Sequence, residues 1–231
     1  MEWSLPPELP WPQFLRLLRH PAPPKGWLEA AADLPDLRKR PLLLRWIAQH
    51  PKAPAHLRMR LLPRLPWRAL TAIAQDASAH PQARAHATER LQSLWGGMTL
   101  GERRSLAIHA PRPMWEPIWK VRDTGVLAAF LAHPKLGGEA LRALIQPPLS
   151  PFQAMALQMS RWRESAYIAE QVLVALDQSL DLPESGLVLG MAAPWIKALS
   201  MEERLNAAAR LTHPALRRTT RAWALPLPEE E

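Results

Sequence analysis

Histidine is the residue whose spacing in this sequence first suggests chemistry, because five of the eight histidines stand directly before a proline. Imidazole side chains ligate metal ions and change their charge near neutral pH. The first three of these histidines are 30 residues apart, which in a helical repeat is about one repeat rise and too far for one metal ion. Because proline ends the preceding helix, we predict that each imidazole caps a helix C-terminus and that the chain holds no metal. The five are His20, His50, His80, His133 and His213.

Arginine is concentrated in the middle of the sequence, where it suggests binding to anions. Residues 37–112 carry 14 Lys or Arg residues and three acidic residues, whereas the whole chain has a net charge of +8. Repeats align equivalent positions, so these arginines would form a basic stripe that fits an acidic helix or a phosphate backbone. The alternative is a solvated face whose aliphatic stems cover the core. The candidate partner-binding residues are Arg58, Arg60, Arg64, Arg68, Arg84, Arg90, Arg103 and Arg104.

Trp119 and Asp123 are four residues apart, which places an aromatic ring and a carboxylate on one helix face. This pairing resembles the aromatic cleft and catalytic acid of alkylpurine DNA glycosylases, which are built from HEAT-like repeats, and the resemblance implies a base-excision enzyme. The dense Trp-Asp-x-x-Asp stretch of that family is absent, and the neighbours Arg122 and Gly125 favour a helix N-cap at Asp123. The chain also lacks cysteine, a glycine-rich phosphate loop and the zinc-protease and serine-hydrolase motifs. We therefore expect no enzymatic activity, no catalytic residue and no cofactor.

Tryptophan is unusually frequent, with 11 residues that recur along the chain. A large ring near a helix end fills the wedge between repeats while its N–H donates to a carbonyl. We expect most of these rings in the core, and the alternative is an exposed aromatic anchor for a partner. Trp3 and Trp11, in a proline-rich leader, are the expected exposed exceptions.

The elements that position these side chains are predicted to be helices. Leucine, alanine and arginine are good helix formers, and no stretch alternates apolar and polar residues as a strand does. The His-Pro spacing divides residues 21–110 into three units of 30 residues, each predicted as two short helices. Ser200 and Glu203 have the spacing of a capping box. The remaining helices are predicted near residues 137–146, 151–160, 162–179, 184–193, 200–211 and 214–224.

Two stretches carry a resemblance to a known kind of repeat. Ala48-Gln-His-Pro51-Lys-Ala-Pro54-Ala-His-Leu57 and Ala79-His-Pro81-Gln-Ala-Arg84-Ala-His-Ala87 each show a helix end, a proline break and a new helix. They resemble HEAT-like repeats and the leucine-rich-repeat-variant family, and the resemblance covers roughly residues 20–145. It implies right-handed stacking of antiparallel helix pairs. The iron–sulfur cluster of some variant-repeat proteins needs cysteines, and this chain has none.

The predicted fold is an all-α, right-handed α-solenoid with a period of about 30 residues and a less regular C-terminal helical cap. The expected boundaries are a leader and first helix (1–20), helical repeats (21–145), C-terminal repeats or cap (146–224) and a flexible tail (225–231). No apolar run has transmembrane length, and an acidic residue stands where a signal peptide is basic. We therefore expect no membrane insertion and a cytoplasmic location.

The leading functional hypothesis is a non-enzymatic protein–protein interaction scaffold. It would bind an acidic protein or peptide along the basic middle repeats. The alternative is sequence-independent binding of nucleic acid on the same arginines, and a glycosylase-type enzyme is the third possibility.

Overall fold

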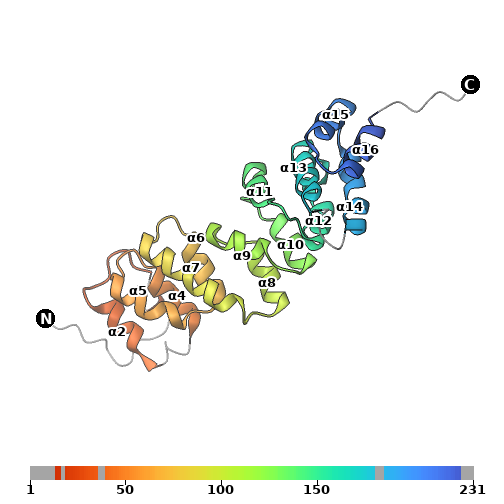
Figure 1. Ribbon diagram of the computed structural model, residues 1–231. Helices are drawn as coiled ribbons and strands as arrows, with labels where there is room; N and C mark the ends of the chain where they lie inside the picture. The colour runs from red at the N-terminus through yellow and green to blue at the C-terminus, as the bar shows by residue number, and fades with distance from the viewer. Residues whose placement is uncertain (1–13, 17–18, 36–39, 180–184, 225–231) are drawn as a thin grey trace, which may run out of the picture. The chain divides into compact units, whose positions relative to one another are not determined.

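The structure, a computed structural model, describes residues 14–16, 19–35, 40–179 and 185–224, with the backbone alone for residues 185–189. Within these ranges the regular elements are α-helices and short 3-10 helices, and no strand occurs (Figure 1). The all-α prediction is therefore confirmed. Two compact units are present: residues 1–99 with 111–114, and residues 100–110 with 115–231.

The first unit is made of short helices whose starts are set by proline. α4 and α7 begin at Pro41 and Pro81, where a missing N–H costs nothing, and Pro54 and Pro66 stand just before α5 and α6. α4 packs against α5, α6 against α7, and the alternate helices α4 and α6, and α5 and α7, also touch. The elements are α2 (Trp27–Asp33), α4 (Pro41–Gln49), α5 (Ala55–Leu61), η1 (Leu62–Arg64), α6 (Trp67–Gln75), α7 (Pro81–Trp95) and η2 (Arg112–Met114).

The core of the first unit is built from one apolar stripe on each helix. Leu57 and Leu61 on α5, and Ala87 and Leu91 on α7, are four residues apart and fully buried. Side chains at this spacing share a helix face, so the same pattern that predicts the helix predicts its buried side. Each fully buried leucine stabilises the unit by about 1.5–3 kcal/mol.

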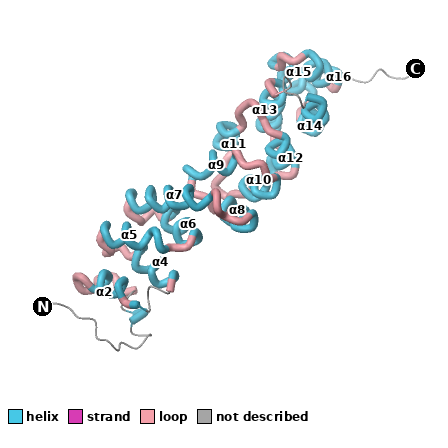
Figure 2. The backbone as a smooth tube through the Cα atoms, turned by 60° about the horizontal axis from the view of Figure 1, so that its bottom comes forward, coloured by secondary structure: helices cyan, strands magenta, loops and turns pink. Residues whose placement is uncertain are grey.

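The second unit has more helices (Figure 2), and α10 and α13 are its central elements. α10 packs against α8, α9 and α12, whereas α13 packs against α11, α14 and α15. The capping box of Ser200 and Glu203 is confirmed, and Ser150 forms a second one with Gln153. The elements are α8 (Leu100–Ala107), α9 (Trp115–Trp119), α10 (Thr124–Leu131), α11 (Gly138–Leu144), α12 (Pro151–Gln158), η3 (Arg161–Glu164), α13 (Ala166–Asp177), α14 (Ser185–Ala198), α15 (Met201–Arg210) and α16 (Pro214–Ala222).

Two predicted helix boundaries in the second unit are wrong. The helix predicted over 162–179 is interrupted, because Ser165 adopts extended backbone and separates η3 from α13. The helix predicted to end near residue 193 continues through Pro194 to Ala198. Trp195 and Ile196 just beyond it are completely buried, and their burial offsets the hydrogen bond that proline removes.

Candidate functional site

The His-Pro corners agree with the prediction of C-terminal caps only in part. At all five corners the imidazole Nδ1 accepts a hydrogen bond from the backbone N–H two residues later, over 3.0–3.3 Å. His80 and His213 are thereby the N-caps of α7 and α16. His50 is the C-cap residue of α4, as predicted, but its ring bonds forward to the Lys52 N–H rather than to a carbonyl of α4, because proline holds the preceding residue extended and turns the ring toward the next helix.

Two of these histidines also connect successive corners. His50 Nε2 lies 3.0 Å from the carbonyl of His20, thirty residues earlier, and His133 Nε2 lies 3.1 Å from the carbonyl of Ala110. Because Nδ1 accepts a bond, Nε2 is the ring atom that donates, which is the arrangement of a neutral tautomer of imidazole. Burial lowers the pKa of His133, which favours the same neutral form. Their role is structural, and the described residues contain no cluster of three His, Asp or Glu that could hold a metal ion.

A buried carboxylate holds the last of the five corners. Asp177, at the end of α13, is 4% exposed and accepts hydrogen bonds from the Thr212 N–H, the Thr212 hydroxyl and the His213 N–H. These distances are 2.7, 2.6 and 2.9 Å. Sequence reasoning missed this residue, because nothing near Asp177 in the chain indicates partners 35 residues away.

Two of the candidate arginines on α5 make structural contacts. The Arg58 guanidinium donates to the carbonyls of His50 and Pro51 over 2.9 and 3.1 Å, and so completes that corner. Arg60 forms an exposed ion pair with Asp33 at 3.2 Å. Arg58 is thus half-buried, and its guanidinium is already hydrogen-bonded to the backbone of the corner.

Of the other candidates in the first unit, Arg90 lines a shallow groove, and Arg64 directly follows the lining residue Pro63 in the chain, whereas Arg68 and Arg84 are not lining residues. Arg64, Arg68 and Arg90 are exposed, and Arg84 is half-buried on α7. The groove has a volume of about 290 Å³. Its lining residues are Met59, Leu62 and Pro63 on one side and His86, Glu89, Arg90 and Ser93 on the other.

Arg103 and Arg104 lie on α8, in the second unit. The Arg104 guanidinium is 3.5 Å from the Asp123 carboxylate and lies directly over Gly125, where any Cβ would meet it. Asp123 also accepts a hydrogen bond from the Val126 N–H at 2.8 Å, so its predicted role as an N-cap is confirmed. The candidate arginines therefore fall in both units, six in the first and two in the second.

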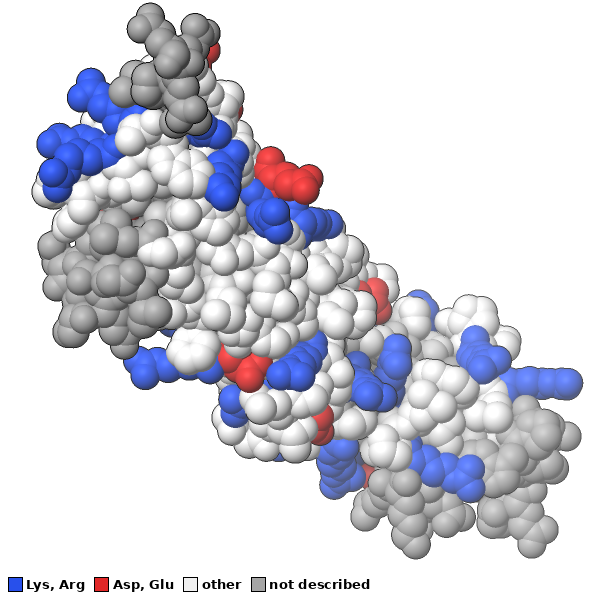
Figure 3. All heavy atoms as spheres, turned by 90° about the vertical axis from the view of Figure 1, so that its right-hand side faces the viewer, with Lys and Arg blue, Asp and Glu red and all other residues white. Residues whose placement is uncertain are grey.

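Basic side chains extend beyond the candidate set. Arg217, Arg218 and Arg221 on α16 are all exposed, and the sequence analysis did not select them. On the face drawn in Figure 3, Lys and Arg side chains are more widespread than Asp and Glu side chains.

The expectation that most tryptophans lie in the core holds only in part, because four of the nine described tryptophans are buried and four are half-buried, namely Trp46, Trp67, Trp95 and Trp162. Trp27, Trp115, Trp119 and Trp195 are buried, and the Trp115 N–H donates to the carbonyl of Ala110 at 3.1 Å. Trp223 is an exposed exception, whereas Trp3 and Trp11 lie outside the described residues.

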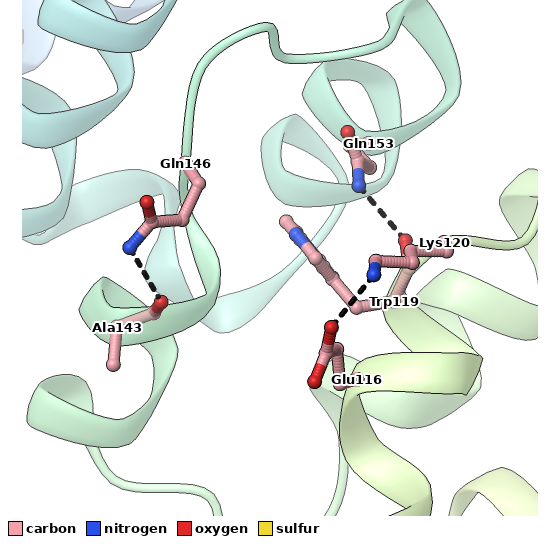
Figure 4. Close-up of polar contacts among 6 residues, drawn as sticks. All are labelled: Glu116, Trp119, Lys120, Ala143, Gln146 and Gln153. Carbon is pink, nitrogen blue, oxygen red and sulfur yellow. Dashed lines mark hydrogen bonds and ion pairs between the residues drawn. The ribbon is translucent and has the colours of Figure 1, made fainter.

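A cleft in the second unit was not anticipated from the sequence. It has a volume of about 530 Å³ and lies between α9 and the segment that joins α11 to α12. Glu116 and Lys120 form an ion pair of 2.6 Å at its edge, and this contact lowers the pKa of Glu116. In Figure 4 the Trp119 indole reaches from α9 toward the side of the cleft that carries Gln146. The one local signal was the pair Pro147-Pro148, which is joined by a cis peptide bond and lines the cleft.

No family model, curated protein or solved structure matches this chain. In the part of the chain that the structure describes, no helix is both long enough and apolar enough to cross a membrane.

Proposed function

We propose that the chain is a non-enzymatic scaffold of the right-handed α-solenoid kind that binds an acidic protein segment on its first unit. Support for the repeat comes from the paired helices α4–α5 and α6–α7 and from the bond between the His20 and His50 corners. Support for binding comes from one observation: the exposed Arg90 lines a groove that also has the apolar side chains of Met59, Leu62 and Pro63, and the exposed Arg64 directly follows Pro63.

The groove suits an amphipathic acidic helix. Met59 is 38% exposed, and Leu62 and Pro63 extend the apolar floor beside it. An amphipathic helix lays its apolar face into such a groove. A methionine floor adapts to varied side chains because its thioether stem is unbranched and flexible.

Exposed arginines of the first unit provide the charge, with Arg90 in the lining of the groove and Arg64 next to the lining residue Pro63. Arg64 and Arg68 have no acidic partner among the described residues, and Arg90 contacts Ser93 rather than a carboxylate. A guanidinium binds a carboxylate with two parallel hydrogen bonds, which orients the partner as well as attracting it. Each exposed pair contributes only about 0–1 kcal/mol, so several arginines must act together.

The test is a triple charge reversal, Arg64→Glu, Arg68→Glu and Arg90→Glu. The probe is a fluorescent peptide of repeated Glu-Leu-Ala-Glu units, followed by anisotropy. The matched control reverses Arg217, Arg218 and Arg221 on α16, which changes the net charge equally. We expect the first variant to weaken binding about tenfold or more and the control to weaken it about twofold or less. Equal losses of affinity in both variants would show that binding depends on total charge. No loss of affinity in the first variant would reject the groove as the binding site.

Duplex DNA as competitor separates the two kinds of partner. If the arginines bind nucleic acid, log Kd should change with log salt by about 0.9 per phosphate contact, and DNA should displace the peptide. The affinity for a peptide held by Met59 and Leu62 should depend less on the salt concentration. Duplex DNA should not displace such a peptide. Strong displacement by DNA would favour the nucleic-acid alternative over the protein scaffold.

The solenoid is tested by small-angle scattering on the whole chain. A compact globule of this length has a radius of gyration of about 17 Å. A solenoid exceeds that value because each repeat contacts only its neighbours. A radius at or below the compact value would reject the repeat architecture.

A further inference from the structure

We propose that the cleft between α9 and the α11–α12 segment is a second binding site, which takes a short, uncharged, extended peptide segment of a partner protein. All its lining residues belong to the second unit, so the site does not involve the groove beside Met59 in the first unit. With about 530 Å³, the cleft has the size usual for ligand pockets, about 300–1,000 Å³.

One wall of the cleft offers a hydrogen-bond donor. The Trp119 ring is 4% exposed and packs against Phe130 with ring centroids 6.4 Å apart, so its position is well defined. Its indole N–H has no acceptor among the described residues, yet solvent reaches it, unlike the sealed nitrogens of Trp27 and Trp195. A buried tryptophan N–H usually finds a partner, so this donor is available to a ligand carbonyl.

The opposite wall offers acceptors. Pro147 and Pro148 have no N–H, so carbonyl oxygens are the polar backbone groups that they present. The Gln146 amide nitrogen donates to the carbonyl of Ala143 at 3.1 Å, which leaves its side-chain oxygen to accept. A donor on one wall and acceptors on the other match a peptide backbone, which carries both groups at every residue.

The charge and polarity of the lining residues determine which kind of peptide the cleft can bind. Glu116 and Lys120 neutralise each other at the edge, and the side-chain amide of Gln153 is fully engaged with Ser150 and with the Trp119 carbonyl. No unpaired charge is left to hold a charged ligand among the lining residues. Leu144 and the two prolines supply apolar surface, so the segment should carry apolar side chains.

The test uses the blocked tetrapeptide acetyl-Ala-Leu-Ala-Leu-amide and the indole N–H resonances of the ¹⁵N-labelled chain. Trp119→Phe replaces the indole by a smaller aromatic ring without an N–H, so it identifies the Trp119 resonance by its loss. We expect the tetrapeptide to shift this resonance saturably in the wild type. Trp119→Phe should weaken tetrapeptide binding, measured on the backbone amides around the cleft, by about five- to tenfold, the effect of one hydrogen bond.

A second pair of variants tests the cleft without altering the tryptophan. Ala143→Phe fills the cleft from α11, and Ala209→Phe places the same side chain on an exposed position of α15. Binding should be lost in the first and kept in the second. An unmoved Trp119 resonance, or full binding by Ala143→Phe, would overturn the proposal. If the resonance shifts with protein concentration alone, the occupant is a second copy of this chain and the peptide is rejected.

Discussion

The imidazole of His133 provides a direct test of the bonds that connect the proline corners. The ring is 1% exposed, donates to the carbonyl of Ala110 over 3.1 Å and accepts from the Lys135 N–H over 3.0 Å. It also meets Trp115 edge-on, with ring centroids 5.3 Å apart. Substitution His133→Ala removes all three contacts at once and leaves a cavity.

The expected cost follows from these contacts. Each hydrogen bond contributes about 1 kcal/mol and the ring pair about 0.5–1.5 kcal/mol. We expect His133→Ala to lower the free energy of unfolding by about 3 kcal/mol, before any cost of the cavity. His80→Ala is the matched comparison, since the exposed His80 ring accepts one bond, from the Gln82 N–H. That variant should lose about 0.5–1 kcal/mol, as an N-cap does.

Urea denaturation followed by circular dichroism measures both variants. The midpoint should fall much further for His133→Ala than for His80→Ala, while the slope of free energy against urea stays unchanged. Equal losses in the two variants would refute the role of the corner-to-corner bond. A changed slope would point to an altered denatured or native state instead of a lost contact.

The remaining predictions concern pH, a buried carboxylate and metals. Burial lowers the pKa of His133 from 6.5, so its contribution to stability is complete above about pH 6.5 and is lost as pH falls through the lowered folded-state pKa. Urea midpoints between about pH 8 and pH 5 should therefore decline more steeply in the wild type than in His133→Ala, and parallel declines would contradict this. Asp177→Asn should lower the unfolding free energy by about 2–4 kcal/mol, because three donors lose a charged acceptor, whereas the exposed Glu164→Gln should change it by under about 0.5 kcal/mol. A chelator should leave the melting temperature of the chain unchanged, and a drop accompanied by stoichiometric zinc or iron in the preparation would reopen the metal hypothesis for the histidines.

Local signals in the sequence predicted most helix starts. Proline allows few backbone conformations, and a side-chain cap acts within three residues, so Pro41, Pro81 and Ser200 mark the first turns of α4, α7 and α15 without help from the rest of the fold. Ala83, Ala87, Leu91 and Leu94 recur at helical spacing on α7, and the first three are buried whereas Leu94 is half-buried, so the spacing indicates the buried side of this helix.

The functional features depend on contacts that no local pattern contains. The continuation of α14 through Pro194 is explained by the burial of Trp195, and the groove beside Met59 is formed by two separate helices. The cleft at Trp119 joins residues about thirty positions apart. Sequence spacing cannot say which faces of distant helices meet, because that depends on how all the side chains pack together.

The histidine of the His-Pro motif illustrates both what the local sequence determines and what the tertiary structure decides. The sequence by itself determined that each histidine stands at a break between helices, because proline disfavours the helical conformation just before it. Only the tertiary structure decided that His50 bonds to a carbonyl thirty residues earlier, while the exposed His80 ring makes one local bond. A hydrogen bond needs its two atoms within about 3 Å, and packing alone brings such distant parts of a chain together.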